Sequence, residues 1–162
     1  MGWRVNSSKM WSLGTLEPID YEDDCCVAGE FRRWTRERLS SLRVVSVRYP
    51  THRYSVWSDM KTGRGMDWHH DGALLGEYIV VWANIEPTLF RLAGSRYKND
   101  PNKFETYQGA PGEVIMFHNV YFQHTAPTMT SMKLARQRWF IRSAVSGNAI
   151  VRDVPGVYQY LT

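Results

Sequence analysis

Seven short apolar segments follow one another between turn signals over residues 42 to 145, and this pattern constrains the fold more than any other feature of the chain. They span residues 42–50, 52–60, 77–85, 88–94, 112–118, 120–126 and 136–145. Turn-forming sequences such as KTGRG, NDPNK and GAPGE separate them. Short strands at regular spacing predict a mainly β sandwich or barrel of antiparallel strands, of which the jelly roll is one type.

One helix is expected before these strands, from Glu22 to about Leu42. Val27, Phe31, Trp34 and Leu42 recur near helical spacing. Acidic residues stand at its start and arginines follow, which is the charge order that the helix dipole favours. We expect this helix to flank the sheet.

The length and composition predict one domain over residues 1–162. The chain has 162 residues, of which 43% are hydrophobic, enough for the core of one ordinary domain. It contains no run of 18 apolar residues, so no membrane association is expected. The two cysteines, Cys25 and Cys26, are adjacent in the predicted helix and cannot close a loop by a disulfide. Together with the absence of an apolar leader stretch, this favours a cytoplasmic protein.

The net charge of +4 and the sequence pI of about 9.2 are compatible with an anionic partner. Arg32, Arg33, Arg36 and Arg38 crowd the predicted helix. A solvated helix face is the simpler interpretation of such a run, and a nucleic-acid partner stays open. The sequence does not indicate an oligomeric state.

The stretch MDWHHDG, residues 66–72, is the candidate centre of chemistry. In an extended chain, His69 and Asp71 point to one side and His70 points away. The pair supplies two ligands for a divalent metal, and the third must come from His52, His118 or His124. His124 is the best placed, because it follows the GEVIMFH segment, where the second half of a double-stranded β-helix would return to the mouth of the barrel. Two histidines and one carboxylate are the ligand set that leaves positions open on a non-haem Fe(II) ion.

Three features together resemble the Fe(II)- and 2-oxoglutarate-dependent dioxygenases: WHHDG, then PGEVIMFHNVYFQHTAP, then an arginine on the next strand. The resemblance covers roughly residues 42–145 and includes traits of both the phytanoyl-CoA hydroxylase branch and the taurine dioxygenase branch. It implies a double-stranded β-helix, a cupin-like jelly roll, with the N-terminal helix at its flank. It also implies that His69, Asp71 and His124 bind iron.

The resemblance implies a basic residue that binds the far carboxylate of 2-oxoglutarate. Arg136, Arg138 and Arg142 have the same strand parity, so all three can face inward. Arg138 is the first choice and Arg136 the second, because the hairpin before them brings Arg138 nearly opposite His124. The Ser or Thr that commonly stands two residues after the family's arginine is missing here.

An enzyme of this family uses O2 to convert 2-oxoglutarate to succinate and CO2 while it hydroxylates, or oxidatively demethylates, a substrate. Asp71 favours this chemistry over halogenation, in which a small residue replaces the carboxylate. His70 is expected to face away from the metal, and His118 to be a buried, hydrogen-bonded residue. The substrate is not indicated, and residues 93–111 and the N-terminal segment are the expected lid. Two alternatives stay open: a cupin-type metalloprotein without 2-oxoglutarate, and a non-catalytic, basic nucleic-acid-binding module.

Overall fold

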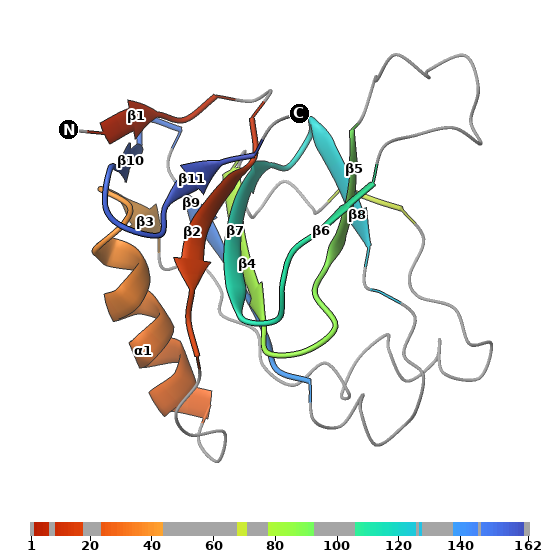
Figure 1. The fold of residues 1–162 in the computed structure, drawn as a ribbon, viewed down its shortest axis with the longest axis horizontal. Helices are drawn as coiled ribbons and strands as arrows, with labels where there is room; N and C mark the ends of the chain where they lie inside the picture. Colours follow the sequence, from red (N-terminus) through yellow and green to blue (C-terminus); the bar gives the residue numbers. More distant parts are fainter. Residues whose placement is uncertain are drawn as a thin grey trace.

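The described part of the chain is mainly β with one helix (Figure 1). The computed structural model describes residues 2–6, 9–17, 24–43, 68–70, 78–92, 106–125, 127, 138–145 and 147–160. The elements in chain order are β1 (Gly2–Arg4), β2 (Trp11–Thr15), α1 (Asp24–Arg36), β3 (Leu42–Arg43), β4 (Tyr78–Ala83), β5 (Leu89–Leu92), β6 (Thr106–Gln108), β7 (Glu113–His118), β8 (Phe122–Thr125), β9 (Phe140–Val145), β10 (Ile150–Arg152) and β11 (Tyr158–Gln159). Among the described residues, no helix has the length and apolar character needed to span a membrane.

Two antiparallel sheets form the body of the fold. The larger one has six strands in the order β11-β2-β7-β4-β9-β3, and the smaller has three in the order β6-β5-β8. Strands β1 and β10 form a separate two-stranded sheet. In Figure 1 the six-stranded sheet stands between α1 on one side and the three-stranded sheet on the other.

Each face of the six-stranded sheet covers its own apolar cluster. Trp82 of β4 belongs to the cluster that includes Phe31 of α1, which is fully buried. Ile79 and Val81, the alternate residues of β4, belong to the cluster between the two sheets, with Phe90 of β5. Because both faces of β4 are covered, its sequence YIVVWA is a continuous apolar run with every residue buried.

The strand pairs between residues 42 and 145 are nested. β3 pairs with β9, an isolated bridge at His69 pairs with β8, β4 pairs with β7, and β5 pairs with β6. The outermost elements of this described series, β3 and β9, are therefore neighbours, and the pairs continue inward to β5 and β6. Strands β3, β4, β7 and β9 lie in the six-stranded sheet. Strands β5, β6 and β8 form the three-stranded sheet, and the bridge at His69 lies at its β8 edge.

For the described residues, the predicted mainly β architecture with one helix is confirmed, and five of the predicted segments contain β4, β5, β7, β8 and β9. Of the segment 42–50 only β3 is described, and 52–60 lies outside the described residues. The predicted helix end was wrong, because α1 stops at Arg36. Leu39 then bridges to Val151 and Leu42 pairs with Val145 of β9, so both leucines are buried by strand pairing rather than by continued helix.

The predicted N-terminal lid was also wrong for the described residues. β2 lies inside the six-stranded sheet, paired with β7, and its residues Trp11 and Leu13 are core. Within the second expected lid, residues 93–111, the structure contains β6, an ordered strand at the edge of the smaller sheet. Residues 93–105 lie outside the described part of the chain.

Candidate metal centre

His69 and His124, two of the three predicted ligands, are direct neighbours in the structure. Their backbones form an antiparallel bridge in which each N–H donates to the carbonyl of the other. The two N···O distances are 3.1 Å from His69 and 3.0 Å from His124. Directly opposed residues on paired strands place their side chains on the same face of the sheet. The bridge therefore holds the two imidazoles side by side.

The geometry of the two rings suits a shared metal ion. Their centroids are 4.6 Å apart and their planes are inclined at 60°. Two imidazole nitrogens that bind one ion, each about 2.0 to 2.1 Å from it, stand at most roughly 4 Å from each other. A centroid separation of 4.6 Å between inclined rings is compatible with that nitrogen–nitrogen distance.

His124 lies in the layer between the two sheets. It is 5% exposed, and its ring centroid is 5.0 Å from that of Phe117 on β7. Phe90 pairs with His124 in register and also belongs to the inter-sheet cluster. The pair of histidines is thus bordered by aromatic side chains that keep bulk water from one side of the site.

The third predicted ligand, Asp71, and the second-choice arginine, Arg136, lie outside the described residues. Within the residues that are described, no group of three or more His, Cys, Asp or Glu side chains could hold a metal. His52, the remaining candidate ligand, also falls outside them. The structure therefore brings together two of the predicted ligands and does not describe the third.

His118 and His70 are held by other contacts. His118 alternates with Phe117 on β7 and lies on the opposite face of the sheet, against the ring of Tyr78 at 4.9 Å between centroids. Its Nδ1 accepts hydrogen bonds from the backbone N–H groups of Val120 and Tyr121. The predicted hydrogen-bonded role is confirmed, although the side chain is half-buried rather than buried.

His70 is exposed, and its Nδ1 donates to the carbonyl of Asn119 over 2.6 Å. Because a carbonyl can only accept, this hydrogen bond places the ring proton on Nδ1. The ring of His70 is therefore engaged by the turn that follows β7. Its orientation away from the metal stays a prediction.

Arg138 is a fully buried cation. Its side chain is 1% exposed, and its Nε donates to the carbonyls of Ile85 and Glu86 over 3.2 and 2.9 Å. Its Nη2 is buried and has no hydrogen-bond partner among the described residues, and no carboxylate among them forms an ion pair with it. Burial lowers the pKa of Arg138 to about 10, with the carboxylate of Glu86 acting in the opposite direction, so the group stays charged at neutral pH.

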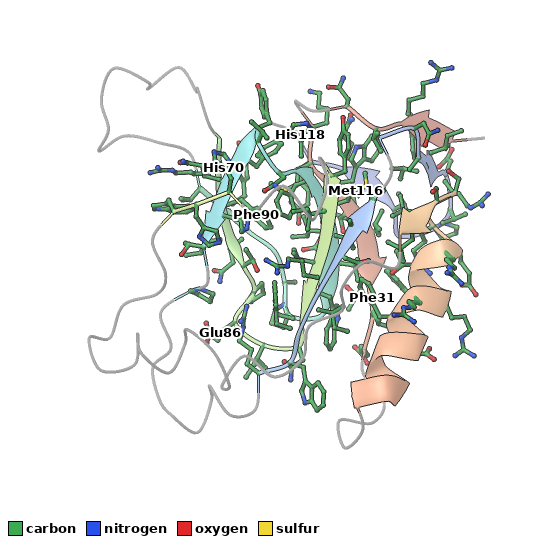
Figure 2. All side chains as sticks on the ribbon, turned by 180° about the vertical axis from the view of Figure 1, so that it is seen from behind. Phe31, His70, Glu86, Phe90, Met116 and His118 are labelled. Atoms are coloured by element: carbon green, nitrogen blue, oxygen red, sulfur yellow. The ribbon has the colours of Figure 1, made fainter. Side chains whose placement is uncertain are left out.

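The guanidinium of Arg138 reaches into the layer that contains His124. Its Cζ is 5.2 Å from the ring centroid of Phe140, which packs against the inter-sheet cluster. Figure 2 shows Glu86, whose carbonyl anchors Arg138, at the lower end of this layer, below Phe90, the partner of His124.

Arg142 lies on the same face of β9, further along the strand. It is half-buried and stands opposite Val81, a member of the inter-sheet cluster. Four residues of extended chain separate it from Arg138, or about 13 Å along the strand. The two arginines thus offer positive charge at two different depths of one layer.

The backbone that anchors Arg138 is itself unusual. Glu86 has a φ of 46°, in the left-handed region that non-glycine residues rarely adopt. This turn directs two consecutive carbonyls, those of Ile85 and Glu86, to the same guanidinium. A locally costly conformation that orients a buried cation is typical of a binding site.

Two arginines in and just after the basic helix α1 contact nearby side chains. Arg33 forms an ion pair with Glu30, and Arg38 stacks on Trp34, with its Cζ 3.6 Å from the ring centroid. Arg33 and Arg36 lie in the last helical turn, where positive charge suits the dipole. Arg33 and Arg36 are exposed, which agrees with the simpler interpretation of a solvated helix face, whereas Arg32 and Arg38 are half-buried.

One set of side chains near the site was not singled out from the sequence. Arg91 on β5 lies 5.0 Å from the ring centroid of Trp68, measured from Cζ, and its Nε donates to Oε1 of Gln123 over 2.5 Å. Only the pairing of β5 with β8 makes Arg91 and Gln123 direct neighbours. No signal in the sequence alone gives that register, whereas Trp68 adjoins the histidines and could have been noted.

Comparisons with known proteins give no independent assignment. The sequence matches no protein-family profile and no curated protein, and the structure matches no solved structure. The interpretation of the site therefore depends on its residues and their geometry.

Proposed function

We propose that this chain is an Fe(II)- and 2-oxoglutarate-dependent dioxygenase that hydroxylates, or oxidatively demethylates, a substrate still to be identified. The bridge between His69 and His124 is the observation that carries the proposal. The motif predicted these two residues as ligands from positions far apart in the chain. Chance placement of two histidines would not require them to be hydrogen-bonded neighbours whose ring centroids are 4.6 Å apart.

The nested strand pairing supports the jelly-roll form of the fold. In a jelly roll, a long antiparallel hairpin is rolled up, so that first and last strands pair and successive strands change sheet. The pairs β3 with β9, the bridge at His69 with β8, β4 with β7, and β5 with β6 follow that order. The same arrangement explains why the two metal ligands are beside each other.

The state of Arg138 supports an anionic cosubstrate. A buried charge costs several kcal/mol unless a counter-charge pairs with it, and among the described residues no carboxylate forms an ion pair with Arg138, so its site is suited to an anion. The far carboxylate of 2-oxoglutarate would provide this counter-charge through the planar guanidinium fork. The alternative function, a cupin-type metalloprotein without 2-oxoglutarate, does not explain why Arg138 is buried at this position.

Each residue of the site has a separate role in this proposal. His69, Asp71 and His124 would hold the iron, which when bound activates O2 for the coupled oxidation of 2-oxoglutarate and substrate. Arg138 fixes the far end of the cosubstrate and so sets its orientation. Phe90 and Phe117 border the histidines with apolar surface and limit the access of water to the reacting groups.

The test is the formation of succinate from 2-oxoglutarate by the Fe(II)-loaded protein in the presence of O2. Wild-type protein and the variant His118→Ala should both form succinate, because His118 lies on the other face of the sheet. His124→Ala should abolish it. Equal succinate formation by His124→Ala, or none by the wild type, would contradict the proposal.

A further inference from the structure

The segment Trp68–His70 is fixed to the rest of the fold by contacts on both sides of its backbone. On the inner side, His69 bridges to His124. On the outer side of the three-stranded sheet, Trp68 contacts Arg91, which alternates on β5 with the inward-facing Phe90. His70 contacts the carbonyl of Asn119. Neither contact is part of the metal site itself.

The contact of Trp68 is a cation–π pair with Arg91. The Cζ of Arg91 lies 5.0 Å from the ring centroid of Trp68, and both residues are half-buried. Burial, which withdraws part of the guanidinium from water, also lowers the pKa of Arg91. A cation–π contact is stronger when the cation is desolvated, and tryptophan is the best acceptor.

Arg91 is in turn held in place by Gln123. The two residues are directly opposed on β5 and β8, and Nε of Arg91 donates to Oε1 of Gln123 over 2.5 Å. Gln123 precedes His124, and Trp68 precedes His69. The chain Gln123, Arg91, Trp68 therefore joins the residues immediately before the two histidines, on the face opposite to their rings.

We propose that Arg91 is a positioning residue for the metal: by clamping Trp68 to Gln123 across the outer face of the sheet, it fixes the spacing of His69 and His124. The inference rests on the proposed function only in taking these two histidines as ligands. Within the described part of the chain, the backbone connection is a bridge of one residue pair, with two hydrogen bonds between His69 and His124. The outer clamp adds a side-chain contact that resists sliding or twisting of the segment.

The experiment measures metal affinity rather than activity. Co(II) is used as the probe, and its binding is followed by visible absorption in competition with a chelator. Arg91→Met keeps most of the side-chain length and removes the cation, and it should weaken Co(II) binding roughly 10-fold, at the lower end of the effect of residues that orient metal ligands. Arg33→Met, the same substitution at an exposed position on α1, should leave the affinity unchanged.

Two further variants separate positioning from general destabilisation. Trp68→Leu should weaken Co(II) binding to a similar extent, and adding Arg91→Met to it should cause little further loss, because both act through one contact. Thermal unfolding of the metal-free variants shows whether they are folded. If Arg91→Met fails to fold, Gln123→Leu, which releases Arg91 without removing it, should give a smaller loss in the same direction.

The outcomes are distinct. Unchanged affinity in folded Arg91→Met or Gln123→Leu, with a wild type that binds Co(II), overturns this inference and leaves the proposed function intact. A wild type that binds no Co(II) overturns both. Fully additive losses in the double variant would show that Arg91 does not act through Trp68, which also overturns the inference.

Discussion

Replacing Arg138 by methionine should weaken 2-oxoglutarate binding and leave the metal in place. The guanidinium is 1% exposed, and two backbone carbonyls already orient it, so little side-chain freedom remains to be lost when an anion binds. A hydrogen bond to a charged group in such a site contributes about 1.5 to 3 kcal/mol. The dissociation constant for 2-oxoglutarate should therefore rise roughly 10- to 150-fold.

Stability of the unliganded protein provides the internal control. Methionine fills most of the volume of the arginine, and replacing a buried charge by an apolar side chain is often neutral or stabilising. Folded Arg138→Met with an unfolding temperature near that of the wild type would show that the loss concerns binding. Arg138→Lys keeps the charge but not the fork, and should recover only part of the affinity.

The assay is an anaerobic calorimetric titration of 2-oxoglutarate into the Fe(II)-loaded protein, with Arg142→Met as the matched variant. Arg142 lies on the same face of β9 at a different depth, so only one of the two can meet the far carboxylate of a bound cosubstrate. A large loss in Arg142→Met with none in Arg138→Met would show that the assigned depth is wrong and leave the enzyme class standing. No loss in either variant would refute the cosubstrate itself.

Three other predictions concern the rest of the molecule. Without substrate, the Fe(II)-loaded wild type should convert 2-oxoglutarate to succinate slowly and only with O2, as product analysis can show; turnover that persists in His124→Ala would rule this out. His70→Ala and His118→Ala should each retain one metal per chain by elemental analysis, since their Nδ1 atoms are engaged elsewhere; loss of metal in either would contradict the ligand assignment. Tyr158→Phe removes the 2.7 Å hydrogen bond to Glu113 and should lower the free energy of unfolding by about 1.5 kcal/mol at pH 7, the lower end for a hydrogen bond to a charge because Tyr158 is half exposed. Burial tends to raise the pKa of Glu113, but the hydrogen bonds that its carboxylate accepts outweigh burial and lower this pKa. The stabilisation from Glu113 is therefore present above its ordinary pKa of 4.5 and is lost as the pH falls through the lower pKa of the folded state. The free energies of unfolding of wild type and Tyr158→Phe should converge in acid, and a difference that stays constant with pH would contradict this.

The central strands were predictable because their apolar composition indicates that they are buried. β4 and β7 are runs of apolar residues that need cover on both faces, and such runs identify buried strands. β2 was missed because WSLGT is short and contains Gly14, whose φ of 109° accompanies a shift of register against β7. The end of α1 was misplaced because Leu39 and Leu42 continue a helical pattern, while long-range pairing with β10 and β9 decides their structure.

The candidate site was predictable to the extent that residue type and spacing determine it. The pairing of His69 with His124 agrees with the motif, and hydrogen bonds to other parts of the chain engage His70 and His118. The anchoring of Arg138 by Ile85 and Glu86 was not predictable, because it depends on a turn in the left-handed region. The contact of Arg91 with Trp68 depends on strand register, which sequence patterns do not determine.

The most direct measurement is anaerobic reconstitution with Fe(II), followed by titration with 2-oxoglutarate while the visible absorption is recorded. We predict one Fe(II) per chain and a new absorption band that saturates with 2-oxoglutarate, with metal binding lost in both His69→Ala and His124→Ala. Protein that binds no Fe(II), or that binds it equally well without these two histidines, would contradict the assignment of His69 and His124 as iron ligands.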